Sequence, residues 1–144
     1  MEVVIKKHDE DIIKVTIACK DTTDHVKNLK KYIEMYKERI RGKCGQEIVY
    51  IELSEILYFE AVERRVFLYT VDQVVEIAEK LYELETLLPA EDFIRCSKSM
   101  IVNINKIVSL RPELNRTVSV TMCNQERLQI SRRYVAAFKK VIGL

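Results

Sequence analysis

Several residue types are scarce in this 144-residue sequence, and each scarcity narrows what the chain can be. It has only 3 Gly and 2 Pro and no low-complexity run, so its composition does not predict a disordered or fibrous chain. Its apolar runs are far shorter than the roughly 20 residues of a membrane-spanning helix, and its first residues form no signal-peptide core. We therefore expect a globular, cytoplasmic protein without a membrane segment.

Residues that bind metals or perform catalysis are also sparse. The 4 Cys are far apart, no two of them form a C-x-x-C pair, and the 2 His complete no zinc-ligand spacing. We find no Gly-rich phosphate loop and no Ser/His/Asp set of a hydrolase. The sequence thus predicts no enzyme, metal, cofactor or small-molecule ligand. Its cysteines are expected to be reduced thiols, and spacing gives no support to a redox role for Cys96 or Cys123.

Charged residues are plentiful but unevenly distributed. Residues 1–94 carry 14 Lys+Arg against 20 Asp+Glu, a net charge of −6, whereas residues 95–144 carry 10 against 2, a net charge of +8. A basic end of this kind favours a polyanionic partner. The alternative is that the basic end complements the acidic part of the same chain, because net charge bears on association and not on fold.

Apolar periodicity predicts a ββα segment at the N-terminus. Residues 1–8 and 12–19 are β-branched runs that favour a hairpin. Residues 24–41 favour an amphipathic helix that ends at Gly42 and Gly45. The apolar face of that helix consists of Leu29, Ile33, Tyr36 and Ile40.

The rest of the chain has the pattern of short strands closed by a helix. Turn residues separate the apolar runs, and Pro89 ends a short helix over residues 79–88. A last helix is expected from Ser131 onward, with Ser131 as its N-cap. The expected strands cover residues 47–52, 56–59, 66–70, 74–77, 93–96, 107–110, 117–122 and 127–130.

Four segments in the C-terminal two-thirds of the chain resemble, in order and spacing, the LytTR family of bacterial DNA-binding domains. They are Ile51–Glu60 (IELSEILYFE), Leu81–Glu85 (LYELE), Phe93–Asn103 (FIRCSKSMIVN) and Leu128–Arg133 (LQISRR). The resemblance covers roughly residues 46–142. It implies a mainly β (α+β) fold of small stacked antiparallel sheets with short helices. It also implies that loops, and not a recognition helix, read successive major grooves of double-stranded DNA.

The resemblance divides the chain into an N-terminal ββα extension, residues 1–45, and a LytTR-like DNA-binding domain, residues 46–144. Family members usually act in transcription, often attached to a receiver domain, for which 45 residues are too few. We therefore expect a stand-alone transcription regulator. The apolar residues of the extension exceed what it needs to cover itself, which favours a homodimer; packing on the rest of the same chain is the alternative.

Three turns match the DNA-contacting positions of the family. Arginine suits guanine because its fork matches O6 and N7, while lysine and serine hold phosphates. A helix N-terminus at Ser131 would add backbone N–H groups. We name these sites the first turn (Glu63, Arg64, Arg65), the second turn (Ser97, Lys98, Ser99) and the third turn (Ser131, Arg132, Arg133).

Each assignment has a plainer alternative. The first turn could be an ordinary exposed hairpin tip, and the third a solvated first turn of a helix. Glu63 departs from a purely basic tip and could accept a hydrogen bond from a cytosine amine. Asn103 is more typical of a buried, hydrogen-bonded amide than of a base reader. Further phosphate contacts are expected, at most, from Arg95, Lys106 and Arg116.

A rival function remains open at this point. The basic end could dock an acidic protein partner, which would make the chain a protein-interaction module and not a DNA reader.

Overall fold

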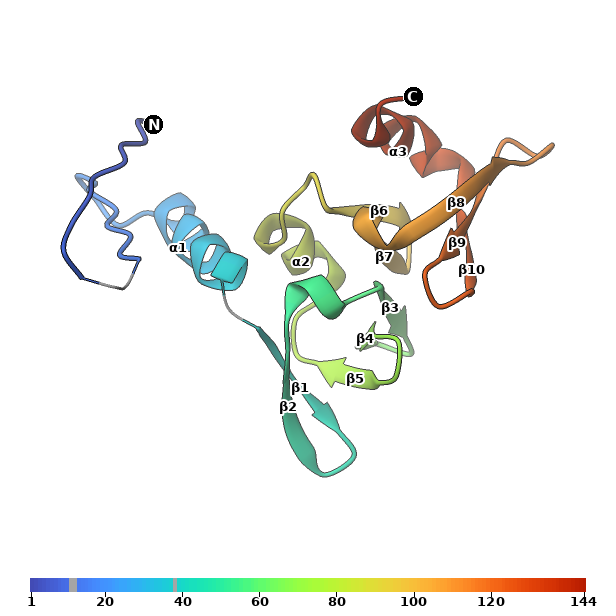
Figure 1. Ribbon diagram of the computed structural model, residues 1–144, viewed down its shortest axis with the longest axis horizontal. Coiled ribbons are helices and arrows are strands. Elements are labelled where there is room, and N and C mark those ends of the chain that lie inside the picture. The colour runs from blue at the N-terminus through green and yellow to red at the C-terminus, as the bar shows by residue number, and fades with distance from the viewer. Residues whose placement is uncertain (11–12, 38) are drawn as a thin grey trace.

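Two antiparallel sheets form the body of the protein in the computed structural model, which describes residues 1–10, 13–37 and 39–144 (Figure 1). Sheet A has seven strands in the order β2-β1-β5-β4-β3-β7-β6, and sheet B has three in the order β10-β9-β8. The predicted mainly β (α+β) fold is therefore confirmed. The strands are β1 (Ile40–Cys44), β2 (Glu47–Ile51), β3 (Tyr58–Val62), β4 (Arg65–Tyr69), β5 (Val74–Ile77), β6 (Phe93–Ser97), β7 (Met100–Asn103), β8 (Ile107–Pro112), β9 (Val118–Met122) and β10 (Arg127–Ile130).

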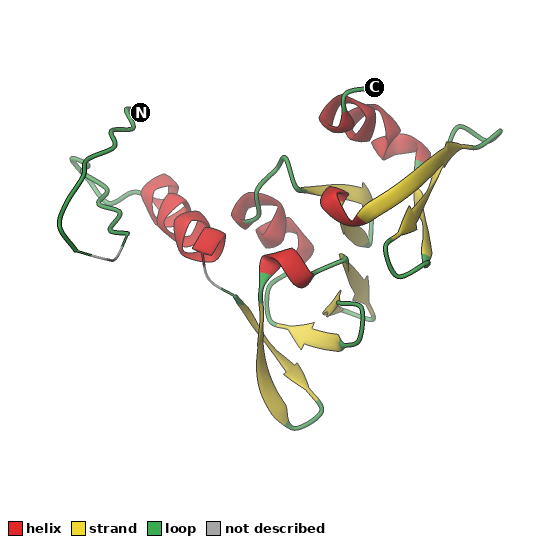
Figure 2. Cartoon of the chain, viewed as in Figure 1, coloured by secondary structure: helices red, strands yellow, loops and turns green. Residues whose placement is uncertain are grey.

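Helices are short and peripheral (Figure 2). Helix α1 lies beside α2, and α3 closes the chain against β6. Among the described residues, no helix is long and apolar enough to cross a bilayer. The α-helices are α1 (Asp24–Lys37), α2 (Leu81–Leu87) and α3 (Val135–Ile142), and the 3₁₀ helices are η1 (Leu53–Glu55), η2 (Ile104–Lys106) and η3 (Arg132–Tyr134).

Strands β3 and β7 contribute to two separate hydrophobic cores, one on each face of sheet A. In β3, Phe59 belongs to the core that α2 covers, whereas Tyr58 belongs to the core shared with sheet B and α3. In β7, Ile101 and Val102 divide in the same way. Successive side chains of a strand point to opposite faces, so the part of a strand that is buried on both faces must be apolar at successive positions. This explains the continuous apolar runs at residues 56–59 and 100–102.

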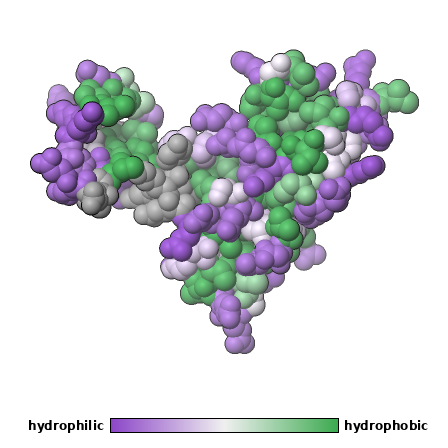
Figure 3. Space-filling view, viewed as in Figure 1, coloured by the Kyte–Doolittle hydropathy of each residue, from purple (hydrophilic) through white to green (hydrophobic). Residues whose placement is uncertain are grey.

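The predicted N-terminal hairpin is wrong within the described residues. Residues 1–10 and 13–20 contain no strand. Their apolar side chains are exposed, with Ile5 at 93% and Val15 at 54% of full accessibility, and hydrophobic residues reach the surface at the left of Figure 3. A two-stranded hairpin is marginal unless its apolar face packs on something. The β-branched residues of this N-terminal segment therefore do not suffice to form a hairpin. Asp11 and Ile12, the second of which fell in the predicted strand 12–19, lie outside the described residues.

The predicted helix 24–41 ends too late. Helix α1 stops at Lys37, and Ile40 begins β1, where it is buried in the first core and not on a helix face. Gly42 lies inside β1 and not at a helix end. Only glycine fits at this position, because an added Cβ would approach a methyl of Val75 to 2.3 Å. Gly45 occupies the β1–β2 turn with φ +63°, which glycine adopts without strain. Glu38 and the side chain of Tyr36 lie outside the described residues.

The proposed domain boundary therefore falls in an integral hairpin. Residues 45 and 46 both lie between β1 and β2, which pair from Ile40↔Ile51 to Cys44↔Glu47. Strand β1 also pairs with β5 through Lys43↔Glu76. Sheet A thus begins at Ile40, before the predicted boundary.

Tyr58 connects the two sheets. Its hydroxyl donates a 2.7 Å hydrogen bond to a carboxylate oxygen of Glu126, in the β9–β10 turn, and its ring stacks on Tyr69 at 4.4 Å. Burial and then the hydrogen bond to Glu126 raise the pKa of Tyr58 well above its usual value near 10. The hydroxyl therefore remains a donor across the physiological range.

We expect the boundary of the folded unit to lie before β1. A fragment of residues 39–144 should unfold in urea at nearly the same midpoint as the full chain. A fragment of residues 46–144 lacks β1. Its free energy of unfolding should fall by more than about 2–4 kcal/mol, because the loss of one large buried side chain such as Ile40 already costs that much. Urea denaturation of both fragments checks this. Equal midpoints for the two would show that β1 is dispensable.

Replacing Tyr58 with phenylalanine should cost about 1–2 kcal/mol of unfolding free energy at neutral pH, because it removes a hydrogen bond to a charged acceptor. The folded-state pKa is raised, so this stabilisation is present below about pH 10 and lost as the pH rises further. The difference between wild type and Tyr58→Phe should shrink above that pH. Chemical denaturation at pH 7 and above pH 10 measures it, with Tyr82→Phe, a change at an exposed tyrosine of α2, as the control. A pH-independent difference would contradict the role of the hydroxyl.

Candidate nucleic-acid interface

The first turn joins β3 to β4 in a strained conformation. Glu63 and Arg64 both have positive φ, 51° and 66°, at positions where hairpins favour Asn and Gly. Arg65 is held by Glu76 of β5, with Nε 3.4 Å from the carboxylate. Arg64 is exposed at the tip. Non-glycine residues at positive φ cost stability, and such outliers concentrate at functional sites.

The second turn joins β6 to β7, and polar contacts fix its shape. The strand register shifts between Arg95 and Ser97. The hydroxyl of Ser97 accepts from the backbone N–H of Ser99 at 3.2 Å and lies 3.4 Å from its hydroxyl. Lys98 is exposed. The turn therefore presents one cation between two serine hydroxyls, a set suited to phosphate oxygens.

The third turn differs from its prediction. Ser131 makes no side-chain cap hydrogen bond, and Arg132 and Arg133 lie in the 3₁₀ helix η3, one turn before α3 begins at Val135. The N–H of Ser131 instead donates to the carbonyl of Cys96 at 2.8 Å. Ser131 is thus the N-cap residue, as predicted, but of η3 and without the predicted side-chain cap hydrogen bond, and both arginines are exposed. Because the N–H of Ser131 is bonded to β6 of sheet A, it is not available to a ligand.

Backbone hydrogen bonds place the second turn between the other two. On one side, the N–H of Ala61 in β3, just before the first turn, donates to the carbonyl of Ser99 at 2.8 Å. On the other side, the bond from Ser131 to Cys96 ties the start of the third turn to β6, just before the second. Sequence segments far apart in the chain thus form one row of three turns. Among the described residues, no ion pair is formed by Arg64, Lys98, Arg132 or Arg133.

Residues of the first turn, the second turn and the start of α2 line an open groove of about 490 Å³. Four cationic side chains belong to its lining: Arg64, Lys80, Arg95 and Lys98. None of the described residues that line it is acidic. Lys80 was missed from the sequence. Its ammonium donates to the carbonyl of Arg64 at 3.1 Å and so connects the start of α2 to the first turn. No sequence signal marks this contact, because it joins residues from separate elements.

The other sequence candidates lie elsewhere. Lys106 is half-buried in η2, and Arg116 is exposed with φ 66° in the β8–β9 turn, so both belong to the border of sheet B. Asn103 is buried; its amide donates to the carbonyl of Ile56 at 2.8 Å and accepts from the N–H of Asn105 at 3.0 Å. The prediction of a buried structural amide is confirmed.

Cys96 is fully buried beneath the second turn. Burial raises the pKa of its thiol to about 12, and the thiol contacts the carbonyl of Met100 at 3.5 Å. A thiol of that pKa is almost wholly protonated near neutral pH, and the thiolate is the reactive form. This supports the expectation that Cys96 has no redox role. Cys123, by contrast, is exposed. In the described part of the chain, no group of His, Cys, Asp or Glu could hold a metal ion.

Comparisons with known proteins point to one family. The profile of the LytTr DNA-binding domain matches residues 46–143. A solved LytTr DNA-binding domain from Bacillus cereus superposes with a TM-score of 0.72 at 30% identity, covering 75% of this chain and 99% of that one.

Longer curated proteins are also similar. A sensory transduction protein LytT from Enterococcus faecalis is 36% identical over 69% of this chain, and its Bacillus subtilis counterpart is 24% identical over the whole chain. The chain spans 42% and 60% of their respective lengths. An uncharacterized HTH-type transcriptional regulator from Staphylococcus aureus is 33% identical over 72% of this chain and 69% of its own length.

Proposed function

Since this chain belongs to the LytTR family of DNA-binding domains, we propose that it binds duplex DNA sequence-specifically and regulates transcription. One observation carries the proposal: three turns lie in a row, the second hydrogen-bonded to segments flanking the other two, and each exposes a cation that forms no ion pair within the described part of the chain. The names of the similar proteins, which describe sensory transduction and transcriptional regulation, point the same way.

The reading heads in this proposal are turns. In the described residues, α1, α2 and α3 are each followed or preceded by strands or a 3₁₀ helix, so no two of them form a helix-turn-helix pair. Arg64 and the arginines of the third turn have the forked geometry that guanine edges accept, whereas Lys98 and its serines suit phosphates. We propose that the first and third turns enter major grooves on either side of the second.

Selection from a random duplex pool, followed by binding at several salt concentrations, tests the proposal. A sequence-specific reader enriches one motif, prefers it strongly over scrambled duplex, and loses affinity linearly in log salt. Equal binding to every polyanion would instead favour a module that docks an acidic protein partner.

Single replacements Arg132→Ala and Arg133→Ala should weaken binding to the selected motif while leaving the fold intact. Both side chains are exposed, so their loss should not disturb the core. At least one should cost about 1–3 kcal/mol, roughly 5- to 150-fold in Kd, and relax base preference at one position. Fluorescence anisotropy with a set of single-base variants of the motif measures this.

Arg41→Ala is the matched control, because Arg41 is an exposed arginine in β1, separated from the third turn by strands β5, β4, β3 and β7 of sheet A. It should lower affinity only slightly and equally for all sequences. Wild-type affinity in both Arg132→Ala and Arg133→Ala would remove the third turn from the interface.

We further propose that the N-terminal segment mediates a homodimer. The exposed apolar side chains of residues 1–10 and 13–15 support this, because large exposed apolar groups favour association. The α1 residues Leu29 and Ile33 are half-buried, and α1 contacts α2 of the same chain, so the exposed residues before α1 are the better candidates.

A dimer would gain affinity for paired half-sites by effective concentration. Binding by the full chain should depend on half-site spacing with the period of one DNA turn, whereas the fragment 39–144 should bind one half-site weakly at any spacing. Sedimentation velocity and spacing-variant duplexes measure both. A full chain that sediments as a monomer, free and on a two-site duplex, would exclude the dimer.

A further inference from the structure

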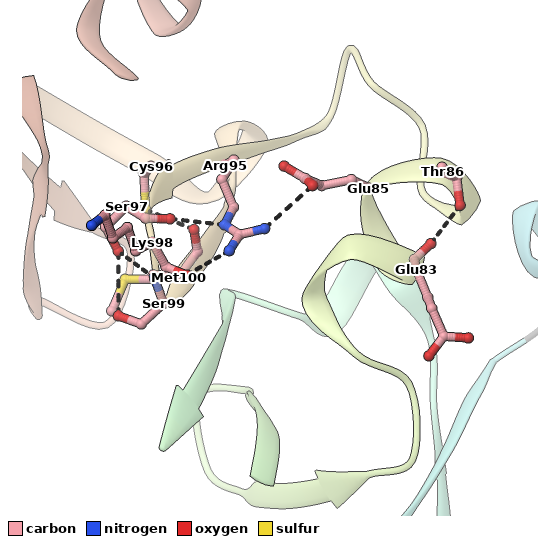
Figure 4. Close-up of polar contacts among 9 residues, drawn as sticks. All are labelled: Glu83, Glu85, Thr86, Arg95, Cys96, Ser97, Lys98, Ser99 and Met100. Carbon is pink, nitrogen blue, oxygen red and sulfur yellow. Dashed lines mark hydrogen bonds and ion pairs between the residues drawn. The ribbon is translucent and has the colours of Figure 1, made fainter. Parts of the chain in front are cut away.

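Arg95 is turned inward, toward the protein. Its side chain is only 21% exposed, and all three of its nitrogens have partners (Figure 4). Nε donates to the carbonyl of Ser97 at 2.8 Å, and Nη2 donates to the carbonyl of Lys98. Nη1 lies 3.2 Å from the carboxylate of Glu85 in α2. A side chain with these contacts has little freedom left to reach a phosphate.

These contacts fix the backbone of the second turn. Ser97 and Lys98 lie where the β6–β7 register shifts. Their two consecutive carbonyls accept from one planar guanidinium, so their separation and direction are set by the fork. On its other side, the same turn is closed by the contacts of the Ser97 hydroxyl with Ser99. The direction in which Lys98 leaves the protein therefore depends on Arg95.

The guanidinium is itself oriented by Glu85. The Glu85 carboxylate forms an ion pair with Nη1, the nitrogen that makes no contact with the turn. Figure 4 shows Glu85 extending from α2 toward Arg95, on the side away from the turn. Its side chain is 42% exposed, so it is accessible to solvent and not part of a core. An acidic residue thus supports a basic turn without itself facing into the groove of four cations.

We propose that Glu85 and Arg95 are positioning residues for DNA recognition: Glu85 orients Arg95, and Arg95 holds the second turn in the shape that presents Lys98 to DNA. This rests on the proposed function and assigns Arg95 a role different from the phosphate contact expected from the sequence. The pair acts through the turn, so neither residue contacts DNA.

The proposal predicts an effect opposite to simple electrostatics. Removing a negative charge beside bound DNA reduces repulsion and strengthens binding to any sequence. If Glu85 positions the turn, Glu85→Gln weakens binding to the selected motif, by about three- to tenfold for a coupled polar network. Arg95→Lys keeps the positive charge but has no planar fork, so it weakens binding to a similar extent.

The experiment compares the full-length wild type with Glu85→Gln, Arg95→Lys and the double variant, with Glu91→Gln as the matched control. Glu91 is exposed in the loop that follows α2, and among the described residues it has no hydrogen bond or ion pair. Anisotropy on single-base variants of the motif gives affinity and base preference, and a salt series gives the number of phosphate contacts. Thermal unfolding monitors stability.

The expected result is a loss of affinity in both single variants, less than additive in the double variant, with base preference unchanged because the second turn is proposed to contact phosphates. The salt slope should fall in Glu85→Gln as well as in Arg95→Lys, since the phosphate contact of Lys98 weakens although neither change removes a cation. A purely structural role would lower the melting temperature and leave the salt slope at the wild-type value. Equal or tighter binding by Glu85→Gln, as for Glu91→Gln, would overturn the proposal, as would a wild-type salt slope in both single variants.

Backbone NMR of the free protein separates this proposal from the proposed function. Glu85→Gln should shift the amide signals of residues 97–99 and leave those of the first and third turns in place. Unmoved signals at 97–99 would overturn the positioning role whether or not the protein binds DNA. Failure of the proposed function would be recognised separately, as a wild-type chain with no preference for any duplex sequence.

Discussion

The burial of β3 and β7 on both faces is the constraint from which the rest of the structure follows. Neighbouring residues such as Tyr58 and Phe59 enter different cores, so each face of sheet A needs its own cover. Helix α2 covers one face, and sheet B with α3 covers the other. Because these covering elements pack around the same pair of strands, the turns at the strand ends are brought to one border of the sheet. The position of the candidate interface thus follows from the closing of two cores around one pair of strands.

The border of sheet A that carries the three turns also shows how a fold of short strands can hold cations close together. Arg65 forms an ion pair with Glu76, and Arg95 forms one with Glu85. Arg64 and Lys98 are exposed. Paired cations contribute to shape, and unpaired cations contribute to the field that attracts a polyanion. The net charge of +8 over residues 95–144 therefore overstates the number of side chains free to meet DNA.

Local patterns in the sequence were sufficient for most strands and for the family, because turn residues and alternation are short-range signals. They failed where a long-range partner decides the conformation. Ile40 continued a helical period, yet it becomes a strand residue because Gly42 lets β1 approach β5 closely. The strand β7 was not predicted, since its apolar run has no alternation once both faces are buried. The N-terminal runs had β propensity but no surface to pack on.

The candidate site was predictable in a similar, partial way. The residues of the three turns are visible in the sequence through the family resemblance, but the sequence does not show which of their side chains are already engaged. Lys80 and Glu85 act on the turns from α2, at a sequence distance of 10 to 16 residues, and neither stands in a motif that specifies the contact. Such side-chain to backbone contacts depend on the packing of α2 against sheet A, which composition and periodicity do not encode.

The central place of the second turn has a consequence for the way substitutions in this border combine. The first and third turns each share a backbone hydrogen bond with residues next to the second turn, but neither shares one with the other. Free energies of substitution add for sites without shared partners and deviate from additivity for sites in contact. Changes in the first and third turns are therefore thermodynamically independent, whereas a change in the second turn alters the effect of changes in both. Under the proposed function, substitutions that change base preference in the two outer turns should therefore have additive effects as long as the second turn is kept constant.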